Sequence, residues 1–231
     1  GMPYKIANVT MDVHLTVLPN MPSLWMRSVN KFTDVFAQET FIDELALKVN
    51  QNPYTFRRQL LSDKPRHLAV LDAVAQAANW GNTSGVKQGI AVMGHWNSFV
   101  AQVVEVSVSA GRELTIHRVV SAVDCGTAVN PDLVIAQVES AVIFALSSVL
   151  FGEILLDDGV VQQSNFDDYP VLRMHQTPII ETVIVNSGNT VGGVGEIGVP
   201  CVGPALANAI FAATGERIRE LPLSRLNFII A

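Results

Sequence analysis

Residues 100–123 read VAQVVEVSVSAGRELTIHRVVSAV, and no other part of the chain says as much about the fold. Two runs rich in valine and isoleucine, Val100–Val108 and Leu114–Val123, flank the turn-forming sequence Ser109-Ala110-Gly111-Arg112. β-Branched residues favour strands, and a short glycine-containing connection between two such runs predicts a β-hairpin. A third run of this composition, Gly89–Trp96, precedes them. The sequence therefore predicts a sheet that contains at least one antiparallel hairpin.

Helical patterns lie on both sides of these strands. Between Lys31 and Val49 apolar residues, Phe41 and Ile42 among them, recur at intervals of three and four, which predicts a helix. Asn130-Pro131-Asp132 predicts the start of another helix, because asparagine caps helices well and proline fits the first turn. We also expect helices at 53–61, from about 63 to 80 and at 203–214, a hairpin at 153–163 and a strand at 179–185.

The order of these elements predicts an α+β fold. Helices and hairpins come in blocks and do not alternate, unlike the pattern of a doubly wound α/β protein. We expect a helical segment, then a mixed sheet with hairpins and packed helices. The expected division is residues 1–85, an N-terminal extended segment and helical region, and residues 86–231, a mixed α+β region.

Composition excludes several classes of protein. With 49% hydrophobic and 16% charged residues, the 231-residue chain can bury a large core and is not intrinsically disordered. A net charge of −6 argues against nucleic-acid binding, which normally needs a basic face. The most membrane-like stretch, Ile197–Gly215, contains prolines and glycines, so we expect a buried helix and no membrane span. The N-terminal residues do not form a secretory signal, which leaves cytoplasm and periplasm both open.

The segment Gly192–Pro200, GGVGEIGVP, is the strongest candidate for a functional site. It places one carboxylate, Glu196, among glycines and small apolar residues, with no lysine or arginine between Asn186 and Ala213. Burial disfavours the charged form of a carboxyl group, and that tuning suits a general base. The alternative is an ordinary glycine-rich turn in which the glutamate accepts backbone N–H bonds at a helix start. The spacing alone leaves both interpretations open.

Other polar residues carry weaker signals. The five histidines show no metal-binding spacing, so no metal ligands are expected from the protein. Cys125 needs a nearby base to become a nucleophile, and Asp167-Asp168 is explained equally well by turn chemistry. Gln137 lies in an apolar helix, where a polar side chain is either hydrogen-bonded in the core or faces a ligand.

Several short segments, taken in order, give the chain a family resemblance. They are Trp25–Val29, Glu39–Ala46, Ala122–Gly126, Val129–Asp132, Gln163–Phe166, Asp168–Met174, Gly192–Pro200 and Ala207–Gly215. Through them the chain from Leu24 to its end resembles the C-terminal third of the molybdopterin-binding subunit of the molybdenum hydroxylases. This is the xanthine oxidase and aldehyde oxidoreductase superfamily, and the likeness is to the beta subunits of isoquinoline 1-oxidoreductase type.

The resemblance implies roles for particular residues. Glu196 matches the base that takes a proton from a hydroxide on molybdenum, so that an N-heteroaromatic compound or an aldehyde is hydroxylated. Arg27 matches an arginine that orients substrate. Gln137 matches a glutamine that contacts the pterin, and Gly193 and Gly195 fall in the cofactor-binding glycine segment. The resemblance also implies molybdopterin cytosine dinucleotide with molybdenum, and iron–sulfur clusters on a partner subunit.

Two departures from the family pattern keep the enzymatic role open. Ser140 and Ala141 stand where the family usually has two glycines or Gly-Ala, and their side chains could crowd a cofactor. The family's upstream cofactor-binding loops have no counterpart in this chain, so we expect the remainder of the subunit to come from another chain. The alternatives are a truncated fragment of a longer chain, or a degenerate relative that keeps the fold as a binding or assembly module without cofactor.

Overall fold

The hairpin quoted above lies at the centre of a mixed sheet. The computed structural model describes residues 2–14, 25–82 and 84–231. Strands β1 (Lys87–His95), β2 (Ser98–Val108) and β3 (Glu113–Asp124) are antiparallel neighbours, and the pairing of β2 with β3 is the predicted hairpin. Strand β6 (Ile179–Ile184) extends the sheet beside β3, and β7 (Ile229–Ile230) pairs with the start of β3.

Both β6 and β7 run parallel to β3, which the sequence did not predict. The connection from β3 to β6 contains helix α4 (Pro131–Phe151) and a small hairpin of β4 (Leu156–Asp157) and β5 (Val160–Val161). Parallel neighbours need such a long crossover. The α+β prediction is confirmed, with a mixed rather than a purely antiparallel sheet.

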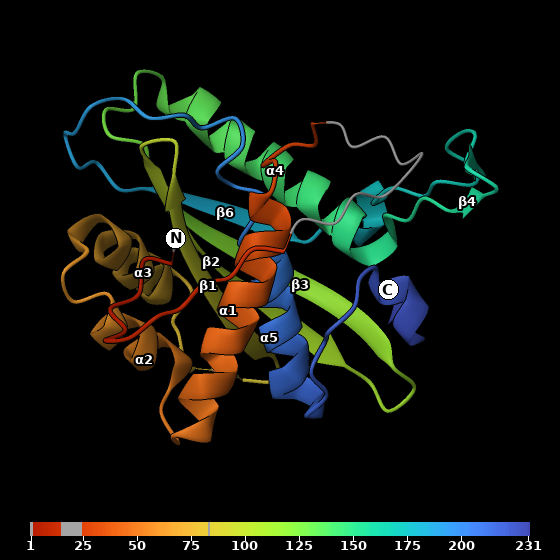
Figure 1. Ribbon diagram of the computed structural model, residues 1–231, viewed down its shortest axis with the longest axis horizontal. Coiled ribbons are helices and arrows are strands. Elements are labelled where there is room, and N and C mark those ends of the chain that lie inside the picture. Colours follow the sequence, from red (N-terminus) through yellow and green to blue (C-terminus); the bar gives the residue numbers. More distant parts are fainter. Residues whose placement is uncertain (1, 15–24, 83) are drawn as a thin grey trace.

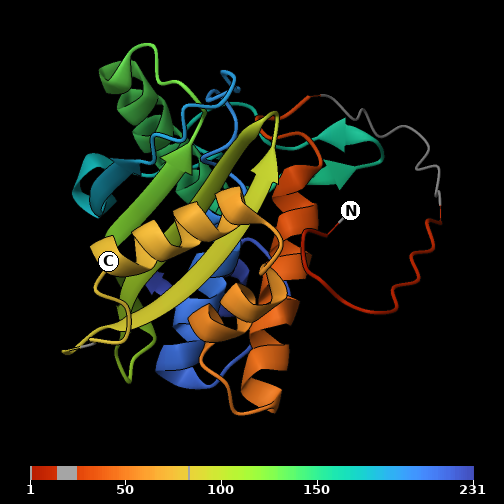
Figure 2. The same cartoon turned by 90° about the vertical axis from the view of Figure 1, so that its left-hand side faces the viewer.

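Helices cover both faces of the sheet (Figures 1 and 2). The strands alternate, so that Ile90 and Val92 pack toward α3 (Pro65–Ala77), whereas Ala91 and Met93 pack toward α4 and α5 (Val202–Thr214). All four side chains are at most 3% exposed. This two-residue period is what a sheet buried on both faces requires.

Helices α1 (Lys31–Lys48) and α2 (Pro53–Leu60) lie beside the β1 edge of the sheet. Helix α5 crosses β1 so closely that a Cβ at Gly89 would lie 2.1 Å from the Ala205 carbonyl oxygen. Only glycine fits there. Because helices α1 to α3 share a core with β1 to β3, the two expected regions are in close contact. The boundary at residue 85 stays a prediction.

The predicted helix starts are confirmed in atomic detail. Asn130 accepts a hydrogen bond from the Leu133 N–H at 3.1 Å, and Asn52 accepts one from the Tyr54 N–H at 2.9 Å. Proline follows each cap as the first helical residue. One detail of α1 differs from its apolar pattern, since Phe41 is 55% exposed whereas Glu39 is fully buried.

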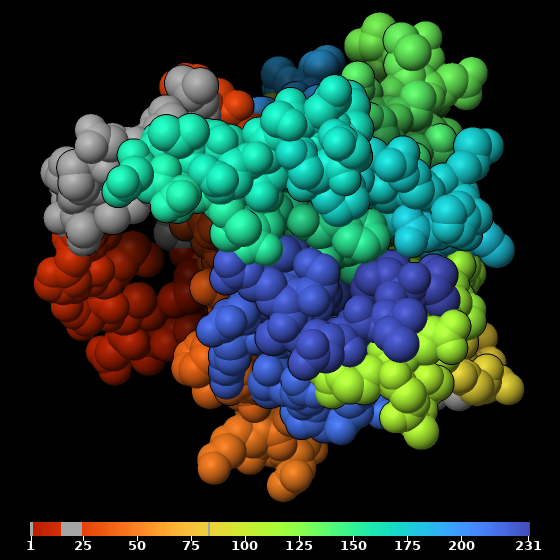
Figure 3. All heavy atoms as spheres, turned by 90° about the vertical axis from the view of Figure 1, so that its right-hand side faces the viewer, coloured from red at the N-terminus to blue at the C-terminus, as the bar shows by residue number. Residues whose placement is uncertain are grey.

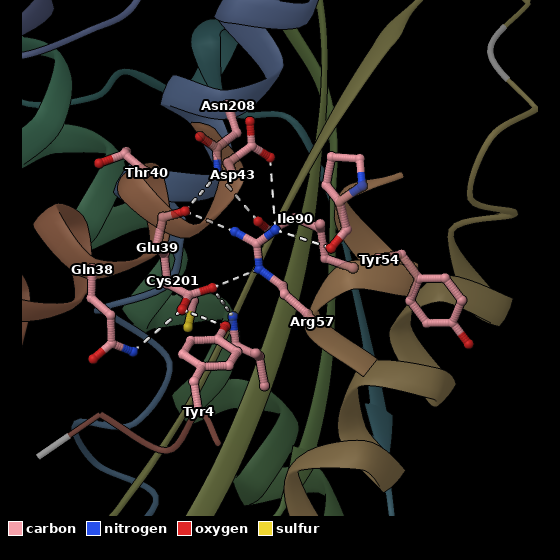
Figure 4. A network of polar contacts seen from close by, with 12 residues as sticks. Tyr4, Gln38, Glu39, Thr40, Asp43, Tyr54, Arg57, Ile90, Cys201 and Asn208 are labelled. Carbon is pink, nitrogen blue, oxygen red and sulfur yellow. Dashed lines mark hydrogen bonds and ion pairs between the residues drawn. The ribbon is translucent and has the colours of Figure 1, made fainter. Parts of the chain in front are cut away.

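Glu39 belongs to a polar cluster inside the protein (Figure 4). Its carboxylate accepts hydrogen bonds from Arg57 Nε at 2.9 Å, from the Tyr4 hydroxyl at 2.6 Å and from the Val92 N–H at 3.1 Å. Arg57 also donates to the Glu39 and Pro53 carbonyl oxygens. The Val92 bond satisfies a backbone donor on the outer edge of β1, so the cluster closes that edge.

The membrane-like stretch at 197–215 is a turn followed by α5, a buried helix of 13 residues. Within the described residues only α4, with 21 residues, is long and apolar enough to cross a membrane. Core helices of globular proteins pass the same test, and the inner face of α4 packs into the core. The β4–β5 hairpin lies against the C-terminal segment (Figure 3), where Arg225 forms an ion pair with Glu153.

Candidate functional site

Three segments that are far apart in the sequence meet at the outer face of α4. The first is the turn that contains Arg27, just before α1 (Figure 1). The second is α4 itself, which carries Gln137 on its exposed face. The third is the turn at Gly195 and Glu196, between β6 and α5. Four of the five residues given roles by the resemblance therefore lie together.

Arg27 joins these segments directly. Its Nε donates to the Gly195 carbonyl oxygen at 2.5 Å and its Nη1 to Ser140 Oγ at 3.1 Å. Its Nη2 donates to the Gln137 carbonyl oxygen at 3.2 Å and to Gln137 Oε1 at 3.0 Å. The guanidinium carbon lies 5.9 Å from the centre of the Phe144 ring. Arg27 thus fixes the distance between α4 and the glycine turn.

Glu196 lies beside this arginine without pairing with it. Its side chain is half-buried, and Oε1 accepts a long hydrogen bond, 3.4 Å, from the Ser28 N–H. No described lysine, arginine or histidine forms an ion pair with it, in keeping with the absence of basic residues from its neighbourhood in the sequence. Its carboxylate is therefore available to a ligand or to a proton.

The turn before α1 has an unusual backbone. Ser28 has φ of +80° and Val29 of +51°, in the left-handed region that β-branched residues rarely adopt. Hydrogen bonds from the Val29 N–H to the Met26 carbonyl oxygen and from the Lys31 N–H to that of Ser28 hold the turn. Such strain is often found at functional sites. Here it presents the Ser28 N–H to Glu196.

The tip of the β1–β2 hairpin holds the other end of the glycine segment. The Gly193 N–H donates to the Trp96 carbonyl oxygen at 3.0 Å, and the Gly192 N–H donates to that of Cys125 at 2.8 Å. A Cβ at Gly192 would lie 2.3 Å from the Asn97 carbonyl oxygen, whereas one at Gly195 would meet nothing within 4 Å. Gly192 is thus required for packing, and Gly195 opens onto free space.

The two residues that were expected to crowd a cofactor, Ser140 and Ala141, both have protein partners. Ala141 is fully buried, and a Cβ at Gly198 would lie 2.8 Å from its methyl group. The Ser140 hydroxyl oxygen instead faces Arg27. The pair therefore packs α4 against the glycine turn on one side and anchors Arg27 on the other.

Charges around the cluster act on its basic groups. Burial lowers the pKa of Arg27, and the negative charge of Glu196 opposes this shift. Burial and the charge of Lys31 lower the pKa of His95, again against the influence of Glu196. The charge of Glu196 therefore acts on both the Arg27 guanidinium and the His95 imidazole.

The surroundings of the other candidate residues, Cys125 and Asp168, indicate a structural role. Burial raises the pKa of Cys125, which is 2% exposed, so this thiol is poorly suited to act as a nucleophile. Asp168 accepts N–H bonds from Ser164 and Asn165, which makes it a turn residue. Within residues 2–14, 25–82 and 84–231, no three His, Cys, Asp or Glu side chains could together hold a metal ion.

Two hollows of the described surface lie elsewhere. One of about 330 Å³ is lined by residues between Ile154 and Tyr169. Another of about 440 Å³ lies beside the start of α3, next to Arg66, His67 and Phe99. Neither includes Arg27, Gln137 or Glu196. Because Gln137, Ser140 and Gly195 are exposed, the cluster forms an open face.

A family model described as "Molybdopterin cofactor-binding domain" matches residues 37–178. The chain belongs to the molybdopterin cofactor-binding domain family. It is 37% identical to the beta subunit of isoquinoline 1-oxidoreductase from Brevundimonas diminuta over 215 residues, which are 90% of this chain and 28% of that protein. One of the subunits of nicotinate dehydrogenase from Pseudomonas putida is 30% identical over 243 residues, covering 96% of this chain and 20% of the relative.

Solved structures of the same kind share the fold. Quinoline 2-oxidoreductase from Pseudomonas putida superposes with a TM-score of 0.75 at 11% identity, over 85% of this chain and 51% of that chain. Aldehyde oxidoreductase from Desulfovibrio desulfuricans gives 0.66 at 14% identity, over 85% and 40%. At these identities the likeness concerns the fold alone. The family resemblance predicted from the sequence is confirmed, and the chain spans under a third of the curated relatives above.

Three residues of the cluster, Ser28, Ser140 and Trp96, were not predicted from the sequence. Ser28 supplies a backbone N–H, and the only sequence feature that points to Ser28 is its position next to Arg27. From the sequence, Ser140 is expected only to crowd a cofactor, although its spacing of three from Gln137 puts both residues on one helix face. Trp96 supports the glycine segment through its carbonyl oxygen, a contact that side-chain chemistry cannot predict.

Proposed function

We propose that this chain is the part of a molybdenum hydroxylase subunit that carries the catalytic base, Glu196. The reaction is oxidative hydroxylation of an N-heteroaromatic compound or an aldehyde. The observation that carries the proposal is the meeting of Arg27, Gln137 and Glu196, from segments 110 and 168 residues apart, on one open face. Membership of the cofactor-binding family supports it.

The residues present fit the cofactor that the family implies, molybdopterin with molybdenum, here as the cytosine dinucleotide. The side-chain nitrogen of Gln137 has no acceptor among the described residues, and the Ser28 hydroxyl is buried without a hydrogen-bond partner. Gly193 and Gly195 expose their backbone. Gln137 and these two glycines would hold the pterin. When bound, the cofactor supplies the two-electron redox chemistry.

Glu196 has the surroundings that a general base needs. It is half-buried, has one long hydrogen bond and has no ion pair with a described residue, so its carboxylate can accept a proton. Arg27 lies beside it and binds both Gly195 and Gln137, so it holds the turn that carries Glu196 against α4.

The open face requires other polypeptides to complete the site. Trp25 and Leu133 lie beside the cluster and are 87% and 63% exposed. Apolar side chains at such exposures around a polar centre are typical of an interface. We propose that the remainder of the subunit covers this face and that an iron–sulfur subunit receives the electrons.

The test is turnover of the complete, cofactor-loaded enzyme with Glu196→Gln. We expect the rate to fall by at least about 100-fold, the usual contribution of a general base, while molybdenum and pterin contents stay at the parent level. Glu216→Gln, which alters an exposed ion pair with Arg112, is the matched control and keeps the parent rate. A parent-like rate for Glu196→Gln would show that the base lies elsewhere.

A second candidate is a binding or assembly module without cofactor. Ser140 and Ala141, which stand where the family usually has glycines, favour it. Molybdenum and pterin analysis of the complete assembly separates the two. An assembly that contains neither supports the module, and one that contains both in stoichiometric amounts supports the hydroxylase.

A further inference from the structure

Arg27 uses nearly all of its hydrogen-bonding capacity inside the protein. A guanidinium has five N–H donors and no acceptor. Four hydrogen bonds go to Gly195, Ser140 and Gln137, the last of which receives two. Little remains for a substrate, so this arginine acts mainly on its protein neighbours.

These bonds determine which way the Gln137 amide faces. Because Arg27 can only donate, the atom of Gln137 that faces it at 3.0 Å is the oxygen, Oε1. The amide nitrogen must then point the other way, and no described residue accepts from it. Gln137 therefore presents N–H donors to whatever lies over the exposed face of α4.

Arg27 also determines which way the Ser140 hydroxyl faces. Two other serines of α4, Ser147 and Ser148, donate their hydroxyl hydrogens to the carbonyl oxygens four residues back, at 2.9 and 3.1 Å. Ser140 makes no such bond, and its oxygen accepts from Arg27. Its hydroxyl hydrogen is thus free to point outward, beside the Gln137 amide.

We propose that Arg27 is a positioning residue that turns Gln137 and Ser140 into a fixed pair of outward hydrogen-bond donors, which select an acceptor edge of the pterin cofactor. This inference rests on the proposed function. A fixed donor pair costs less ordering on binding than a freely rotating amide does. Lysine cannot replace this arginine, because one ammonium group cannot bind α4 and the glycine turn together in fixed directions.

The first test is Gln137→Glu in the complete subunit. A carboxylate keeps the bond to Arg27 and strengthens it by charge, but it has no N–H to offer. We expect a melting temperature no lower than that of the parent, and molybdenum and pterin contents after purification that are lower by about tenfold. Gln76→Glu, the same change at an exposed position of α3, is the control and leaves both contents unchanged.

The second test separates positioning from direct contact. Arg27→Gln and Gln137→Glu are measured singly and together, with cofactor content and melting temperature as readouts. If Arg27 acts through Gln137, the double variant loses no more cofactor than the more affected single variant. Losses that multiply would show that Arg27 contacts the cofactor itself, and would overturn its positioning role.

The outcomes also separate this inference from the proposed function. A parent subunit without molybdenum and pterin contradicts the proposed function. A loaded parent together with an equally loaded Gln137→Glu variant contradicts only the donor assignment.

Discussion

The protein contains two arginine-centred clusters that resemble each other in composition and differ in what they leave open. Around Arg57, a carboxylate, a tyrosine and backbone groups bind one another, and both Arg57 and Glu39 are fully buried. Around Arg27, a carboxylate, a glutamine and backbone groups are also gathered, but at the surface. There Glu196 and the Gln137 amide keep unused hydrogen-bonding capacity.

The difference indicates which cluster serves the fold and which serves a ligand. Burial lowers the pKa of Arg57, but Glu39, Tyr4 and Asp43 outweigh it and hold that pKa above its ordinary value, so Arg57 stays charged. A buried pair whose hydrogen-bonding groups are already occupied by protein partners cannot bind a ligand. An unsaturated cluster at a surface has that capacity, and its loss should leave the fold intact.

The largest effect is expected from Arg57→Met. Removing the arginine leaves Glu39 buried without its counter-ion, and we expect a loss of about 3–5 kcal/mol of unfolding free energy in urea titrations. Arg58→Met is the control at the next position, because Arg58 pairs with Asp72 on the surface and should change stability little. Equal losses for the two variants would contradict the account of the buried cluster.

The next effect is a pH dependence. Burial and the charges of Lys64 and Arg66 lower the pKa of His67 to about 4, below its unfolded value near 6.5. Between these values the unfolded chain binds the proton and the folded protein does not. Stability from this group is complete above pH 6.5 and falls by about 3 kcal/mol toward pH 4. His67→Leu should lose this component, so parent and variant curves that stay parallel through that range would contradict it.

Two glycines of the loop between β6 and α5 are expected to differ in the same way, since one serves the fold and the other serves the site. Gly192→Ala places a methyl group 2.3 Å from the Asn97 carbonyl oxygen, and we expect it to cost about 1–3 kcal/mol in thermal or urea unfolding. Gly195→Ala enters open space and should change stability by less than about 0.5 kcal/mol. It should instead lower the cofactor content of the complete subunit. A stable Gly195→Ala variant with full cofactor content would remove Gly195 from the site.

A small effect on stability is also expected from Arg27→Lys. Its partners lie at the surface, so we expect the free energy of unfolding to change by less than about 1 kcal/mol. A loss as large as that of Arg57→Met would mean that both clusters serve the fold.

Local features of the fold could be predicted from the sequence. The cap at Asn130, the helix start at Pro53 and the β2–β3 hairpin follow from short-range rules, and the structure has them. The parallel pairing of β3 with β6 could not be predicted, because no local pattern specifies a partner strand across a long crossover. Glu39 was missed because the helical pattern of α1 points to apolar residues, and its counter-ion comes from another helix.

The site was predictable only in part. The glycine context singled out Glu196, whereas Gln137 and Arg27 gained their roles through the family resemblance. Their contact spans 110 residues of sequence and depends on how the turn before α1 lies against α4. The orientation of the Gln137 amide and the anchoring role of Ser140 follow from that contact, so the sequence of the helix alone could not supply them.

The central claim is that the open cluster is where the molybdenum centre acts. Crystals of the complete, loaded subunit, measured at the molybdenum absorption edge, locate the metal by its anomalous scattering. We predict that Glu196 is the protein carboxylate nearest to molybdenum, on the exposed side of α4. A molybdenum peak on another face of the protein, with Glu196 turned to solvent, would contradict the account.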